Sequence, residues 1–108
     1  MSDPHQTYVE LVYKIAPRGE WEAAVAIGVY RGSQDDQRDG FIHLSTRSQI
    51  STTLQRHFAG QSDLLLISFE ASALGTALRF ETSRGGQPFP HLYGELDTTL
   101  ALEVAEVG

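Results

Sequence analysis

Residues 64–69 read Leu-Leu-Leu-Ile-Ser-Phe, a nearly unbroken apolar run with polar residues on both sides. A short apolar run without alternation is typical of a strand that is buried on both faces. We therefore expect this run to be the central strand of a sheet, and the flanking segments to supply the elements that cover it.

The chain before this run predicts two strands and two helices. Apolar and polar residues alternate from Tyr8 to Ile15, which indicates a strand, and residues 41–44 indicate a second one. Pro17 opens a short helix that ends near Gly28. The stretch 33–38 is expected to be a polar loop.

The second helix begins at Thr46, which forms a capping box with Gln49, and continues to about Phe58. After the central strand, residues 71–75 indicate a turn or a single helical turn. Three further strands are expected at 78–82, 91–96 and 100–107. This order of elements predicts an α+β domain, with two main helices on a strongly bent, mixed or antiparallel sheet.

Composition limits the class of protein. A chain of 108 residues with 41% hydrophobic residues is expected to form one domain, 1–108, with a loose N-terminal lead at 1–6. The absence of cysteine excludes disulfides, and the lack of a signal peptide or long apolar segment favours a cytoplasmic protein without membrane contact. A net charge of −6 argues against general nucleic-acid binding. Seven of the eight basic residues are arginine, so a local site for a small anion stays open.

The run Asp39-Gly-Phe-Ile-His-Leu-Ser-Thr46 mixes glycine, hydroxyl and histidine residues with apolar alternation. Alternation places Ile42 and Leu44 towards the core and His43 with Ser45 on the other face. His43 is either a structural histidine or a group that binds or protonates a ligand. On the following helix, Thr46, Thr53 and His57 share a narrow stripe that either lines a pocket or is ordinary polar surface.

The run Ser83-Arg-Gly-Gly-Gln-Pro-Phe-Pro-His-Leu-Tyr-Gly94 is the second candidate segment. The backbone N–H groups of Ser83, Gly85 and Gly86 can form an anion-binding nest, and Arg84 can add a bidentate contact to phosphate or carboxylate. The alternative is a simple hairpin turn. His91 and Tyr93 share one face of the next strand, as a proton carrier with a stacking ring or as a structural pair.

Other chemistries find little support in these residues. The three central histidines lie 14 and 34 residues apart, unlike the short spacings of zinc ligands, so no metal site is expected. Ser45, His43 and Asp39 lie on one strand face with parallel side chains, which is poor geometry for a catalytic triad.

The motifs D-G-F-I-H-L-S-T, H-F at 57–58, S-R-G-G and F-P-H-L-Y-G resemble those of a family of small bacterial proteins, the domain of unknown function 952. The V-Y-K-I at 12–15 and Trp21 also match its pattern. The resemblance covers roughly residues 12–104 and implies no activity.

The order of elements is also similar to the ADP-ribosyltransferase fold, which includes the RNA 2′-phosphotransferases. This resemblance implies an NAD-like ligand, with Tyr13 and Lys14 in the first motif, 41–45 in the second and 91–93 in the third. A late glutamate, Glu81 or Glu95, would complete the set.

Three hypotheses follow. The chain is a transferase-like enzyme in which His43, Arg84 and His91 surround a phosphate-bearing ligand such as NAD or a nucleotide. Alternatively, it is a binding module without catalysis, or a structural protein that acts through a surface partner. The sequence does not fix the oligomeric state.

Overall fold

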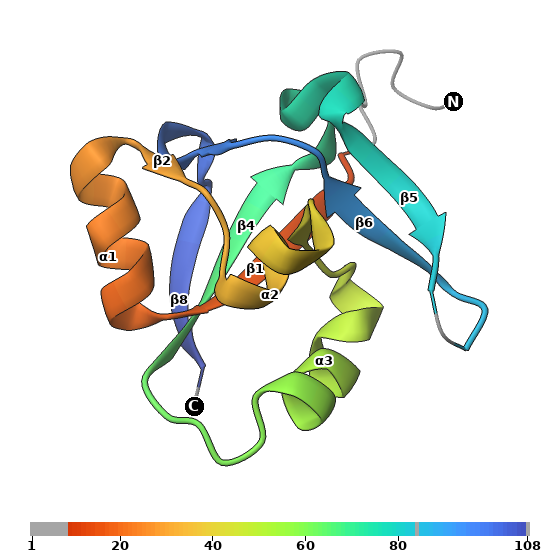
Figure 1. The fold of residues 1–108 in the computed structure, drawn as a ribbon, viewed down its shortest axis with the longest axis horizontal. Helices are drawn as coiled ribbons and strands as arrows, with labels where there is room; N and C mark the ends of the chain where they lie inside the picture. The colour runs from red at the N-terminus through yellow and green to blue at the C-terminus, as the bar shows by residue number, and fades with distance from the viewer. Residues whose placement is uncertain (1–8, 84, 108) are drawn as a thin grey trace, which may run out of the picture.

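The computed structural model describes residues 9–83 and 85–107 (Figure 1). The expectations for the lead at 1–6 and for Arg84 lie outside the described residues. The chain forms a single α+β domain in which every strand pairing between described residues is antiparallel.

The predicted central strand is confirmed. β4 (Leu64–Glu70) pairs with β1 (Leu11–Pro17) on one side and with β8 (Glu103–Val107) on the other. Ile67 and Phe69 of β4 are fully buried, as is Val12 of β1. An apolar run that is covered on both faces has to occupy the middle of its sheet, because an edge would expose it.

A second three-stranded sheet has β6 (Pro88–Leu92) in its middle, between β3 (Ile42–His43) and β5 (Leu78–Thr82). A two-residue pair, β2 (Val29–Tyr30) with β7 (Leu96–Asp97), forms the third. The first two sheets meet at Tyr13 and Ser45, whose backbones exchange two hydrogen bonds of 2.8 Å. The expected bent sheet is thus divided into three small ones.

The first helix lies where the sequence predicts it. α1 (Arg18–Ile27) follows Pro17 and ends at Gly28, whose positive φ of 88° allows the chain to turn back. Trp21 packs α1 against the first sheet, since its ring makes an edge-on contact with Phe69, with 6.2 Å between the ring centroids.

The second predicted helix has an irregular start. Gln49 accepts the Thr46 N–H through Oε1 at 3.0 Å, as the capping motif requires, and a 3₁₀ turn, Arg47–Gln49, precedes α3 (Ile50–His57). No residue of α3 is fully buried, so this helix covers the sheets only loosely.

The prediction of a loop at 33–38 is wrong, because this stretch forms most of α2 (Gln34–Asp39). Ser33 accepts the Asp36 N–H through its hydroxyl at 3.1 Å, and Asp36 accepts the Ser33 N–H at 2.9 Å. This capping box starts a helix that consists of polar residues. Because the helix has no apolar periodicity, the hydrophobic pattern of the sequence does not indicate it. α2 places Asp36 in the interior, where its side chain is 2% exposed.

Two late boundaries also differ from expectation. The strand expected at 91–96 is two strands, β6 and β7, which belong to different sheets because Gly94 lies between them with a φ of 140°. The last strand begins at Glu103, after a 3₁₀ turn at Thr98–Leu100. The expected helical turn near 71–75 is a 3₁₀ segment, Ala71–Ala77. Within 9–83 and 85–107, no helix is long and apolar enough to cross a membrane.

Candidate functional site

The two histidines singled out from the sequence are neighbours. His43 of β3 pairs with His91 of β6 in the antiparallel register, and their ring centroids lie 5.7 Å apart. As predicted, Ile42 and Leu44 point into the core, and each is 2% exposed. Alternation therefore leaves both imidazoles on the face of the second sheet that is opposite to the core.

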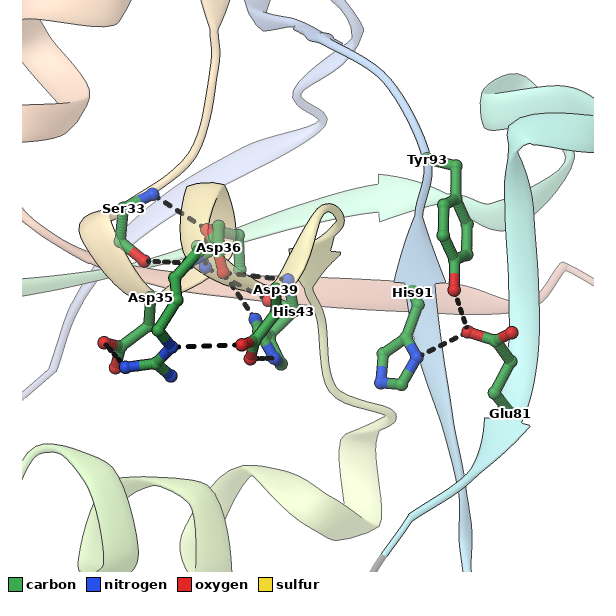
Figure 2. A network of polar contacts seen from close by, with 10 residues as sticks. Ser33, Asp35, Asp36, Asp39, His43, Glu81, His91 and Tyr93 are labelled. Carbon is green, nitrogen blue, oxygen red and sulfur yellow. Dashed lines mark hydrogen bonds and ion pairs between the residues drawn. The ribbon is translucent and has the colours of Figure 1, made fainter.

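Asp36 fixes the orientation of His43 (Figure 2). Its Oδ1 lies 2.6 Å from Nδ1 of the ring and also accepts the His43 backbone N–H at 3.1 Å. Its Oδ2 accepts from the Nζ of Lys14 at 2.9 Å, and Nζ donates further to the His43 carbonyl at 3.1 Å. α2, β1 and β3 thus meet at one carboxylate.

The charge of this buried carboxylate is compensated. Burial alone would raise the pKa of Asp36, but the hydrogen bond from His43 and the charge of Lys14 outweigh it and hold the pKa well below its usual range. Asp36 is therefore an anion at neutral pH. Lys14, expected to touch a ligand, is 5% exposed and lies behind His43 as the counter-ion of Asp36.

A second carboxylate approaches His43 from the end of α2. Asp39 Oδ2 lies 3.0 Å from the ring Nε2. Arg38, which contacts Asp39 at 3.1 Å, lowers the pKa of this aspartate, and His43 adds to the effect. Both nitrogens of His43 thus lie next to negative charge.

His91 has a carboxylate partner of its own on the neighbouring strand. Glu81 of β5 lies diagonally opposite it, and Oε1 is 2.8 Å from Nδ1 of His91. The Tyr93 hydroxyl donates to the same oxygen at 2.7 Å. These hydrogen bonds, from Tyr93 first and His91 second, lower the pKa of Glu81, and the carboxylate in turn raises the pKa of Tyr93.

The ring of Phe41 contacts both histidines. Its ring is stacked on His91, with centroids 4.0 Å apart and planes at 23°, and it also contacts His43 at 4.6 Å and Tyr93 at 5.3 Å. We call His43, His91, Phe41 and Tyr93, with the carboxylates Asp36, Asp39 and Glu81, the two-histidine cluster. Next to this cluster, the guanidinium carbon of Arg79 lies over the Tyr93 ring, 4.9 Å from its centroid.

The glycine loop lies at some distance from this cluster. Ser83 accepts the Gly86 N–H at 3.0 Å and donates its own N–H to Gln87 at 3.1 Å, which closes a tight hairpin turn. The turn lies beyond the pair Thr82–Pro88, whereas His91 pairs with Arg79. Three strand residues, or roughly 10 Å, therefore separate His91 from the start of the turn.

The remaining described candidates make no hydrogen bond to either imidazole. Ser45 is buried, and its hydroxyl lies 3.0 Å from the hydroxyl of Thr53 on α3. Thr46 Oγ1 lies 3.3 Å from Ser48 Oγ, and the Tyr13 side chain is buried. His57 is exposed at the end of α3, and its ring has no hydrogen bond with any described residue.

A shallow hollow borders the cluster. Its lining includes Phe41 and Asp36, two glycines, Gly40 and Gly94, and the exposed ion pair of Arg31 with Glu95. Glu95 is thereby engaged by Arg31. Neither histidine lines this hollow.

Asp36 and Phe41 were not proposed as site residues from the sequence. The signal for Asp36 was the Ser33-x-x-Asp36 spacing of a capping box, which also predicts the helix. Phe41 was placed on the His43 face, yet its contact with His91 depends on the pairing of β3 with β6. In the described parts of the chain, no group of three or more histidine or carboxylate side chains is placed to hold a metal ion.

The structure is thus that of a small α+β domain with two carboxylate-held histidines on one sheet. The model of the family described as "Protein of unknown function (DUF952)" matches residues 15–104, and the chain belongs to this family.

Solved structures of similar sequence have the same fold. The X-ray structure of protein CC0527 from Caulobacter crescentus is 46% identical, with a TM-score of 0.88 over 91% of this chain and 86% of that one. The solution NMR structure of CC0527 is also 46% identical, with a TM-score of 0.80 over 90% and 84% of the two chains. No curated protein matches the chain with significant similarity.

Proposed function

We propose that the two-histidine cluster binds a small phosphate-bearing ligand, with NAD or another nucleotide as the first candidates, and acts on it as a transferase-like enzyme. One observation carries the proposal: two imidazoles with centroids 5.7 Å apart are each held at Nδ1 by a carboxylate. A protonated imidazole attracts phosphate through its charge, and imidazole carries protons near neutral pH. Held in fixed orientations, the two rings can act on one bound group.

The surroundings of the histidines fit a ligand that combines charge with a planar ring. Phe41 and Tyr93 offer aromatic surface beside the imidazoles, and Arg79 lies over the Tyr93 ring. Phosphate and ring of a nucleotide would each find a matching group there. The resemblance in the order of elements to ADP-ribosyltransferases supports the same ligand class.

One observation favours a second candidate, a binding module without catalysis. Glu81 would take the place of the late glutamate of ADP-ribosyltransferases, which helps activate the ribose. Its Oε1 here accepts from both His91 and Tyr93, so the carboxylate is engaged within the protein. A carboxylate held in this way positions its neighbours and has less freedom to act on a ribose.

Calorimetric titration of the full chain with NAD, ADP-ribose and AMP tests the binding proposal. We expect heat with at least one ligand, and loss of that heat in His43→Gln and His91→Gln. His57→Gln is the matched control, because it changes an exposed histidine outside the cluster and should leave binding unchanged. Absence of heat with all three ligands would overturn the proposal.

Mass spectrometry of the bound ligand after long incubation separates the two candidates. A cleaved or transferred product that His91→Gln abolishes identifies an enzyme. An intact ligand with measurable affinity identifies the binding module. If the histidine variants lower only the melting temperature and no ligand binds, the cluster is structural.

A further inference from the structure

The two histidines differ in the contacts of their second ring nitrogen (Figure 2). Each Nδ1 lies at hydrogen-bond distance from a carboxylate, 2.6 Å for His43 and 2.8 Å for His91. Nε2 of His43 lies 3.0 Å from Asp39, whereas Nε2 of His91 has no polar partner among residues 9–83 and 85–107. Two neighbouring imidazoles are therefore placed for different chemistry.

Both ring nitrogens of His43 face carboxylates. Asp36 Oδ1 lies 2.6 Å from Nδ1, and Asp39 Oδ2 lies 3.0 Å from Nε2. A carboxylate oxygen only accepts hydrogen bonds, so a proton on either nitrogen is held by the carboxylate beside it. Neither nitrogen of this ring is therefore free to take a proton from a ligand.

His91 is placed to be a base. When Nδ1–H donates to Glu81, a neutral ring has its lone pair on Nε2. Nε2 of His91 has no hydrogen bond with a described residue, and the side chain is 10% exposed, so this is the ring nitrogen left for a ligand. Stacking on Phe41 and the bond to Glu81 fix the plane of the ring.

We infer that His91 is the proton-transfer residue of the two-histidine cluster, that Glu81 and Tyr93 position it, and that His43, with a carboxylate at each ring nitrogen, takes no proton from the ligand. The inference rests on the proposed function for the source of the proton, a hydroxyl of the ligand or a water molecule beside it. The O–H bond breaks with its electron pair staying on oxygen, and an Nε2–H bond forms. Glu81 stabilises the resulting imidazolium through Nδ1–H, as an orienting carboxylate does in a catalytic dyad.

Diethyl pyrocarbonate tests this division of roles without any ligand, because it acylates an imidazole nitrogen that carries no proton. We expect His91 and the exposed His57 to react in the full chain and His43 to be spared, as read from peptide masses. Exposure alone predicts the opposite order, since the His43 side chain is 40% exposed and that of His91 10%. Faster reaction at His43 than at His91 would overturn the inference.

Nitrogen-15 NMR of the histidine rings adds a readout that a merely structural role would not move. In the free protein, we expect His91 as the Nδ1–H tautomer, with Nδ1–H of His43 directed at Asp36. Glu81→Gln should populate the Nε2–H tautomer of His91, whereas Tyr93→Phe should keep the Nδ1–H form because Glu81 still accepts from it. An Nε2–H tautomer in the unmodified protein contradicts the inference. If the tautomers are as expected and no ligand binds, the proposed function fails and the chemical difference between the rings stands.

Discussion

At the scale of single residues, Asp36 has the largest set of contacts in the site. It is buried and accepts from a lysine, an imidazole and two backbone N–H groups. A carboxylate in the interior is stable only when its partners replace the water that it has lost. Removing a partner should therefore cost more than removing a partner from an exposed pair.

Lys14→Met tests the buried ion pair. It removes the ammonium group that pairs with Asp36, and we expect the free energy of unfolding to fall by about 3 kcal/mol in urea denaturation. Arg31→Met is the control, since it breaks an exposed pair with Glu95 and should cost less than about 1 kcal/mol. The double variant Lys14→Met, Asp36→Asn should recover part of the loss. Equal losses in the two single variants would contradict this view of Asp36.

The stability of the protein should fall in acid through Asp36. The pKa of this group is 3.8 in the unfolded chain and well below that in the folded one, so its ionisation favours folding at any pH above 3.8. The contribution is lost as the pH falls from 3.8 towards the folded value. In urea titrations, Asp36→Asn should be less stable at neutral pH and lose less stability on acidification. Parallel curves for the two proteins would show that Asp36 is not the responsible group.

At the scale of elements, α2 depends on its cap, because it has six residues and no apolar stripe. A helix this short has little stability of its own. Ser33→Ala removes the acceptor of the Asp36 N–H and should cost about 1 kcal/mol. It should also shift the NMR signals of His43, since Asp36 holds that ring. Ser62→Ala, at an exposed position in the loop before β4, is the control and should change neither.

The glycines on either side of α2 give a matched pair of variants. Gly32 and Gly40 both have positive φ, 102° and 86°, so alanine at either position should cost about 1–2 kcal/mol of backbone strain. Only at Gly32 would a Cβ atom meet the protein, at 2.7 Å from Cβ of Asp36. We therefore expect Gly32→Ala to lower the urea midpoint clearly more than Gly40→Ala and to disturb His43. Equal midpoints would mean that Asp36 can move aside.

Elements with a strong local pattern were predictable from the sequence. The unalternating run at 64–69 predicts β4, and Pro17 with Gly28 brackets α1. α2 was missed since its residues are polar on all sides, and only its cap indicates a helix. The burial of Asp36 follows from tertiary contacts with Lys14 and His43, which no local pattern contains.

At the scale of the whole molecule, the candidate site is a product of strand pairing. Alternation in the sequence places His43 and His91 each on the outer face of a strand. Their contact requires the antiparallel register of β3 with β6, and the contact of His91 with Glu81 requires β5 on the other side of β6. Pairings between distant segments have no local signature. The sequence therefore predicts the types of residue in the site and not their partners.

The same arrangement places the site between a well-buried and a more exposed part of the protein. Lys14 belongs to β1, which pairs with the buried strand β4, whereas Glu81 belongs to β5, an edge strand without a fully buried residue. Local opening is easiest where few apolar contacts hold an element. Amide hydrogen exchange should therefore be slowest in β4 and much faster in β5, and a ligand that contacts His91 should slow exchange in β5 with little change in β4. Exchange in β5 as slow as in β4 would contradict this division, and ligand protection confined to β4 would place the binding site elsewhere.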